Sequence, residues 1–268
     1  MKLPSLRVRL RFSLRSLLAA VTAVALLLGW HMYRVARERQ AVQMVLQLGG
    51  TMFFDYQQHP DTDSSTSFDP KAVPRGPQWL RDWLGPEHFD SVVSVSLRGK
   101  PISADHLREM AQFTKLHTLD LSQTPIGDDD LQELTPLTNL KILELSLTAV
   151  SSAGIKHIAP LKKLEWLTLY KTQVDDEALP YIAGLHNLRN LMLDGTRITD
   201  AGTKHLAGLT QMDGWLGLRD TAITDASLPH FQQLKKLQQL NLIETRVTPA
   251  GVRRLRESLP HTQISLHP

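Results

Sequence analysis

The chain has 268 residues, of which 42% are hydrophobic, enough for one or two domains with a sizeable core. The absence of cysteine excludes disulfides, cysteine metal ligands and a thiol nucleophile. The net charge is +3, but residues 1–40 carry a net +7, which leaves −4 for residues 41–268. The basic character therefore belongs to the N-terminus, and the rest of the chain is not expected to bind nucleic acid.

The first expected element is a transmembrane helix at residues 16–33, preceded by a basic segment at 1–15. Residues 16–33 contain no Asp, Glu, Lys or Arg. Their strictly apolar part is short for a membrane-spanning helix. If Arg15 reaches back to the headgroups, the helix lengthens to about 22 residues, or roughly 33 Å. Trp30 and Tyr33 then lie at the far interface, where amphipathic aromatic side chains are favoured.

Two alternatives to this anchor remain open, a cleaved signal peptide and a buried or interfacial helix. Against a signal peptide, no pair of small residues at cleavage spacing follows the apolar stretch. Five basic residues precede the stretch without an acid, whereas three basic residues and Glu38 follow it. This excess favours a cytoplasmic N-terminus and places the rest of the chain outside the cytoplasm, in a single-pass topology.

Residues 34–90 are expected to form a cap over the open end of a repeat array. The elements expected in it are a helix at 34–48, a strand at 51–56, an irregular loop at 58–77 and a helix at 78–84. Gly49 and Gly50 stop the first helix. Trp79 and Trp83 lie four residues apart on the last one, and we expect both indoles to pack into the cap.

Residues 91–268 repeat an apolar pattern with a period of 24 residues. Each unit reads apolar–x–x–apolar–x–apolar–x–x–Thr–x–(Ile or Val), and then carries a second apolar pair after a polar step. One such unit contains Leu164, Leu167, Leu169, Thr172 and Val174. The sixth unit has one extra residue near Asp213-Gly214. Seven full units and a truncated last strand share this phase, which identifies the region as one repeat domain.

Each unit combines a period-2 strand pattern with one apolar face of a short helix. Because one unit cannot bury its apolar face alone, neighbours are expected to stack into a right-handed solenoid. The helices should start at polar caps, namely Ser103, Ser151, Asp175, Thr199, Thr224 and Thr248. The recurring threonines are expected to form a ladder of hydroxyls bonded to backbone groups where each strand ends. These are Thr124, Thr148, Thr172, Thr196, Thr221 and Thr245.

The repeats resemble those of bacterial leucine-rich repeat proteins with a Thr-x-Ile-Thr-Asp-x-Gly-Leu signature. The nearest match here is Thr196-Arg197-Ile198-Thr199-Asp200-Ala201-Gly202. The resemblance covers about two thirds of the chain. It implies an α/β leucine-rich repeat solenoid, with a curved parallel sheet on the concave side and short helices on the convex side. Such proteins often begin with a Phe-Ser-Leu-Arg segment like the one at 12–15, which supports the anchor by resemblance.

Catalytic, cofactor and metal sites are not expected. The sequence lacks a Gly-x-Ser-x-Gly elbow, a phosphate loop, a His-Glu-x-x-His pair and a dinucleotide fingerprint. The acidic loop at 61–69 has oxygens on alternate residues but lacks the glycine and the final carboxylate of a calcium loop. His157, His205 and His230 occupy equivalent places in different repeats, about 10 Å apart, too far to share one zinc ion. The acidic runs at 128–130 and 175–177 are interpreted as helix caps that complement the dipole.

The side chains between the leucines of each strand should face the concave side, because side chains alternate across a sheet. Neighbouring strands lie about 4.8 Å apart, so aromatic residues and Met on three central strands should form one exposed patch. The patch comprises Trp166, Tyr170, Met192 and Trp215, and its charged rim comprises Glu144, Asp194 and Arg219. Gly217 is expected to leave a gap beside it. Alternatively, Trp215 turns inward beside the extra residue and fills a packing fault.

Aromatic residues and Met inside a charged rim are typical of interaction hot spots. The sequence therefore predicts a non-catalytic scaffold on a membrane anchor that binds a protein or peptide through the concave face. Glycan or cell-wall binding by the same aromatic patch is one alternative. A structural role in the cell envelope is another.

Overall fold

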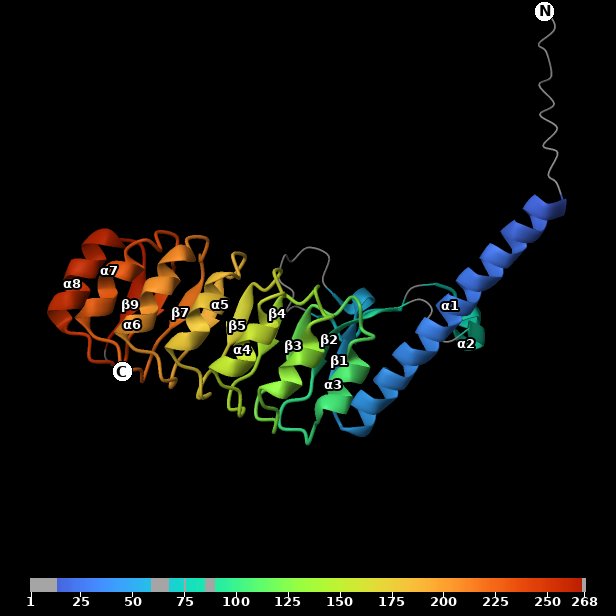
Figure 1. The fold of residues 1–268 in the computed structure, drawn as a ribbon, viewed down its shortest axis with the longest axis horizontal. Helices are drawn as coiled ribbons and strands as arrows, with labels where there is room; N and C mark the ends of the chain where they lie inside the picture. Colours follow the sequence, from blue (N-terminus) through green and yellow to red (C-terminus); the bar gives the residue numbers. More distant parts are fainter. Residues whose placement is uncertain (1–13, 59–67, 75, 85–89, 267–268) are drawn as a thin grey trace, which may run out of the picture.

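The computed structural model describes residues 14–58, 68–74, 76–84 and 90–266 (Figure 1). The basic segment, up to residue 13, and the acidic loop, up to residue 67, lie outside the described residues. In the described part, a long N-terminal helix leads into a nine-stranded sheet with the strands in chain order. Short helices form the second layer of the array, and the N-terminal helix projects away from it (Figure 1).

The strands are three to five residues long. They are β1 Thr51–Phe54, β2 Val92–Ser96, β3 Thr118–Asp120, β4 Ile142–Glu144, β5 Trp166–Thr168, β6 Asn190–Met192, β7 Trp215–Gly217, β8 Gln239–Asn241 and β9 Gln263–Ser265. From β2 onwards all pairs are parallel, and the buried aliphatic residue of each strand pairs with that of the next, as Leu143 does with Leu167. The cap strand β1 adds antiparallel to β2 and covers the open edge of the sheet.

The helices include both α-helical and 3-10 (η) segments. They are α1 Leu14–Gln47, η1 Asp55–Gln57, α2 Gln78–Leu84, α3 Ala104–Met110, η3 Asp129–Leu134, α4 Ser152–Ile158, η4 Asp176–Ala178, α5 Leu179–Ala183, α6 Asp200–Thr203, η5 Lys204–Gly208, η6 Asp225–Ser227, α7 Leu228–Phe231 and α8 Pro249–Ser258. Five expected caps accept a backbone N–H through their side chains: Ser151, Asp175, Thr199, Thr224 and Thr248. At the sixth, the Ser103 N–H instead donates to His106 Nδ1, at 3.0 Å.

The expected anchor and the following helix form one continuous helix, α1. Its most apolar window has a mean hydropathy of 1.6 and none of it is buried, so the alternative of a buried helix is wrong. Among the described residues, α1 is the one helix long and apolar enough to cross a membrane. Its C-terminal part joins the array, where Ala41 and Val45 are fully buried in the core. The helix ends before Gly49, which takes φ +67°.

The repeating threonines bond to backbone groups, as expected, but each stays within its own repeat. Every hydroxyl donates to the carbonyl three residues earlier, at 2.5–2.8 Å. The threonines therefore close a local turn and do not link one repeat to the next. The residue before each threonine has positive φ, including non-glycine residues such as Leu147 and Lys171. The sequence does not indicate this left-handed turn in every repeat, because glycine, the residue that usually marks it, occupies the position only at Gly99 and Gly195.

Aspartates make the links between repeats. Asp128, Asp176, Asp200 and Asp225 each accept two hydrogen bonds from the cap residue of the following repeat. Its backbone N–H donates at 2.7–2.8 Å and its hydroxyl at 2.5–2.8 Å. Asp128 and Asp176 do lie at the starts of their own helices, as expected, but their side chains bond to the following repeat. The two bonds from Thr248 hold the pKa of Asp225 below its usual value.

Candidate binding surface on the concave face

Three of the predicted patch residues surround one slot on the concave face, the face of the sheet opposite the short helices. Trp166 on β5 and Trp215 on β7 flank it, and Asn190 and Met192 on β6 form its floor with Leu191. The slot is shallow and open to solvent, and it encloses no space for a water molecule. The parallel register explains this grouping, because Trp166 pairs with Asn190 and Met192 pairs with Gly217.

The extra residue of the sixth repeat is absorbed immediately before β7. The Asn190 side chain bridges the resulting irregularity, since its Oδ1 accepts the Trp215 backbone N–H at 2.9 Å. A side chain at Gly214 would collide with that amide, so glycine is required there. Trp215 itself remains 36% exposed. The alternative in which Trp215 turns inward is therefore wrong, and the insertion serves to hold this indole at the surface.

Tyr170 and Arg219 border a second depression, of about 130 Å³, next to the slot. The Lys171 ammonium lies 5.4 Å from the centre of the Tyr170 ring, within the range of a cation–π contact. Arg219 forms a two-point ion pair with Glu244, with N···O distances of 3.0 and 2.7 Å. This pair places one positive and one negative group on the exposed rim of the depression.

Asp194 lies deeper than the exposed rim on which it was expected, and it lines the second depression. Its side chain accepts the Arg219 N–H at 2.8 Å and the Asn241 amide at 3.3 Å, and only 5% of the residue is exposed. A Cβ at Gly217 would collide with the Asp194 carboxylate, so no gap exists at Gly217. Burial raises the pKa of Asp194, and the Arg219 N–H opposes that rise.

Glu144 belongs to a separate charged cluster nearer the N-terminal end of the sheet. Arg98 donates to both Asp120 Oδ2 and Glu144 Oε2 at 2.9 Å, and so joins three neighbouring strands. Burial raises the pKa of Glu144, with a further contribution from the Asp120 charge. The predicted rim thus divides into an Arg98–Asp120–Glu144 cluster on one side of the slot and an Arg219–Glu244 pair on the other.

The sequence reasoning missed Asn190, Lys171 and Glu244 as parts of this surface. Asn190 occupies the same strand column as Trp166 and Trp215, so its position was visible, but its bridging bond depends on the insertion. Lys171 and Glu244 lie on the left-handed turns that follow the strands. No glycine marks those two turns, and their orientation toward the concave rim was therefore not apparent.

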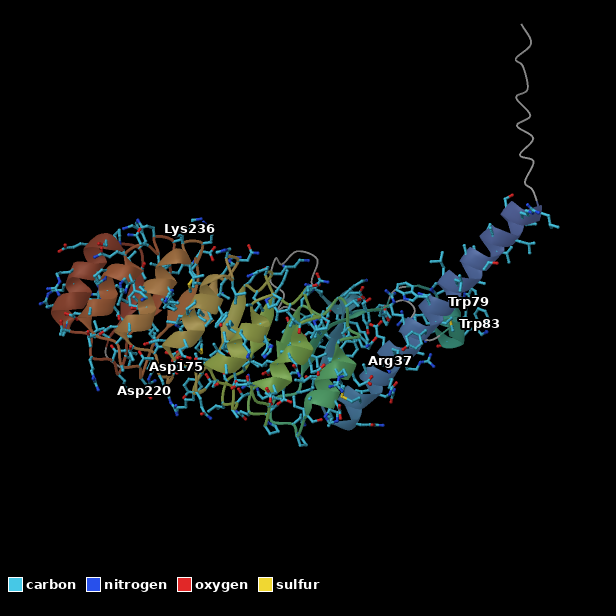
Figure 2. The ribbon with its side chains drawn as sticks, viewed as in Figure 1. Arg37, Trp79, Trp83, Asp175, Asp220 and Lys236 are labelled. Atoms are coloured by element: carbon cyan, nitrogen blue, oxygen red, sulfur yellow. The ribbon has the colours of Figure 1, made fainter. Side chains whose placement is uncertain are left out.

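The cap helix α2 also departs from expectation. Trp79 and Trp83 were expected to pack inside the cap, but 68% and 77% of these residues are exposed. Figure 2 shows both indoles on the N-terminal side of the molecule, far from the concave strands. They therefore do not contribute to the concave surface.

No protein-family model matches the sequence, and no curated protein matches it. Among solved structures, internalin C2 from Listeria monocytogenes is similar with a TM-score of 0.51 and 19% identity, over 66% of this chain and 80% of that one. A leucine-rich repeat protein of Leptospira interrogans gives 0.44 and 24%, over 59% and 45% of the two chains. The plant peptide hormone receptor RGFR1 in complex with RGF2 gives 0.42 and 18%, over 63% and 30%. The fold is that of a leucine-rich repeat solenoid, preceded by a long, exposed apolar helix.

Proposed function

We propose that the chain is a non-catalytic scaffold that binds a protein or peptide through its concave face. The observation that carries this proposal is the slot between the half-buried Trp166 and the exposed Trp215. Both indoles offer large apolar area at the surface although the core beneath them is complete without them. Aromatic side chains in such positions dominate the binding energy of protein interfaces.

The arrangement around the slot suits an extended peptide better than a compact small molecule. Trp166 and Trp215 lie two strands apart, which is about 10 Å across the sheet. That distance corresponds to roughly three residues of an extended chain. Fixed charges of both signs lie on each side, in the Arg98–Asp120–Glu144 cluster and the Arg219–Glu244 pair. A peptide crossing the strands can therefore place apolar side chains in the middle and charged ones at both ends.

Glycan or cell-wall binding is the second candidate. It is favoured by the Asn190 amide between the two indoles, because a sugar ring combines an apolar face with hydroxyls that hydrogen-bond to amides. The same residues serve both candidates, so the chemistry of the captured ligand distinguishes them.

Changing Trp166 and Trp215 together to Ala in the full chain is expected to weaken binding of its ligand at least tenfold. One hot-spot aromatic contributes about 2 kcal/mol, and 1.4 kcal/mol is a factor of ten in affinity. Binding to envelope proteins and to isolated wall polysaccharide is measured in parallel. The matched control is Gln239→Ala, an exposed change in the same strand column. Unchanged binding, or a large loss of thermal stability, would contradict the proposal; loss confined to polysaccharide would select the glycan candidate.

We further propose that α1 anchors the chain in a membrane and holds the array outside the cytoplasm. The support is the exposed apolar surface of α1 together with the charge asymmetry of its flanks. A reporter enzyme that is active only outside the cytoplasm, fused after Pro268, is expected to be active and membrane-bound. An intact but silent membrane-bound fusion would overturn the orientation. Release of a shortened, active fusion from the membrane would instead indicate a cleaved signal peptide.

A further inference from the structure

The exposed face of α2 is the strongest feature of the molecule that the concave surface does not use. Trp79 and Trp83 lie four residues apart and so project from one face of the helix, with 68% and 77% of each exposed. The preceding segment adds Val73, which is 84% exposed. Large apolar side chains gathered in this way on a soluble surface mark a site that contacts another molecule or a lipid surface.

The other side of α2 is fixed to the array. Arg81 lies between the two tryptophans in sequence and points into the protein, where both of its terminal nitrogens bond to the Asp90 carboxylate. Only 9% of Arg81 and 4% of Asp90 are exposed. Asp90 lies two residues before β2, so the ion pair ties α2 to the first strand of the repeat sheet. This ion pair turns one side of α2 toward the array and leaves the two indoles on the exposed side.

The same ion pair places α2 near the end of the apolar part of α1. Burial raises the pKa of Glu38 on α1, and the Val92 backbone, two residues after Asp90, lies close enough to oppose that rise. Glu38 follows Tyr33 by five residues, about 7.5 Å along a helix axis. Trp30 and Tyr33 are 62% and 65% exposed at that end of the apolar stretch. Figure 2 shows Trp79 and Trp83 at the end of the molecule from which α1 projects.

We propose that α2 is an interfacial helix whose Trp79 and Trp83 insert into the headgroup region of the bilayer that α1 crosses. This inference rests on the proposed membrane anchor. Trp30, Tyr33, Trp79 and Trp83 then form one aromatic belt at one membrane surface, where indoles and phenols are most favourable.

The occupant is a lipid surface because the exposed indoles of α2 are attached, through Asp90, to the start of β2, where the proposed membrane anchor α1 meets the array. The one basic residue of α2, Arg81, is neutralised by Asp90. Insertion therefore depends on the indoles and does not need anionic lipid. Because the Arg81–Asp90 ion pair links α2 to the residues before β2, insertion of α2 would add a second point of membrane contact and restrict the tilt of the repeat array.

Fluorescence of the full chain in phosphatidylcholine vesicles tests this proposal, using lipids brominated near the headgroup end of the acyl chains as quenchers. In one variant Trp30, Trp166 and Trp215 are changed to Phe, which leaves the two α2 indoles as reporters. A second variant retains only Trp30 and reports on the anchor. A third retains only Trp215 and is the matched control on the concave face. We expect strong quenching in the first two variants and none in the third.

The outcomes separate the inference from the proposal on which it rests. Quenching of Trp30 without quenching of the α2 indoles would overturn the interfacial helix and leave the anchor intact. A lack of quenching at Trp30 would overturn the anchor itself. As an independent measurement, Trp79→Phe with Trp83→Phe in the otherwise native chain is expected to remove the larger part of the quenchable emission. Unchanged quenching in that variant would also overturn the proposal.

Discussion

Replacing Gly202 with Ala is expected to lower the free energy of unfolding by about 2–4 kcal/mol, through overpacking and lost buried hydrogen bonds. Gly202 is the third residue of α6, and a Cβ there would coincide with the Asp176 carboxylate of the preceding repeat. That carboxylate holds the next repeat through the Thr199 N–H and hydroxyl, at 2.8 and 2.5 Å. To admit a methyl group, it must move and lose both bonds, which weakens the junction between two repeats.

The measurement is chemical unfolding of the full chain in a membrane-mimetic detergent. The matched control is Gly208→Ala, because a Cβ there meets no atom within 4 Å and a surface change of this kind alters stability by about 0.5 kcal/mol or less. Combining Gly202→Ala with Asp176→Ala should cost less than the sum of the two single changes, since removing the carboxylate also removes the collision. An equal loss at Gly208, or strict additivity, would contradict this explanation.

The 24-residue period was sufficient to predict the sheet, its register and five helix caps. Each of these depends on the position of a residue within its own repeat, which a period reveals directly. The aspartate links depend on contacts between repeats, and a capping role explained the same residues equally well. The sequence does indicate these links in one way, because each of three aspartates faces a glycine in the following repeat. The pairs are Asp128 with Gly154, Asp176 with Gly202 and Asp225 with Gly251. At the Asp200 junction Ser227 occupies the glycine position and donates its hydroxyl to Asp200. At one further junction Ser152 stands in place of the aspartate and bonds to Asp175.

The sequence predicted which central residues of the candidate surface lie together, but not how deeply the residues at its edges are buried. Strand alternation determines which face a side chain takes, so Trp166, Met192 and Trp215 could be placed together. Alternation does not determine how deeply a side chain is buried. The Asp194 side chain is buried because Gly217 on the next strand leaves space for it. The burial of Trp79 and Trp83 was predicted wrongly for a related reason. The helix α2 occurs once, outside the period, so no repeated neighbour indicates which of its faces is covered.

Replacing Asp194 with Ala is expected to cost about 2–3 kcal/mol of stability, from unsatisfied buried partners and the space left behind. The Arg219 N–H would lose its 2.8 Å acceptor and the Asn241 amide its 3.3 Å contact. The change would also empty the volume above Gly217 and leave the depression beside Tyr170 without its floor. Thermal stability and ligand affinity should therefore both decrease, although Asp194 itself is buried beneath the binding surface.

Asp194→Asn is expected to behave differently, because it keeps the shape and an oxygen acceptor while removing the charge. Burial raises the folded-state pKa of Asp194, so the ionised carboxylate costs stability at neutral pH. This cost disappears as the pH falls through the raised pKa and the native chain takes up a proton. The Asn variant should therefore be at least as stable as the native chain at pH 7, with the difference shrinking in mild acid. If Asn proved as damaging as Ala at pH 7, the negative charge itself would be what holds Arg219 and Asn241 in place.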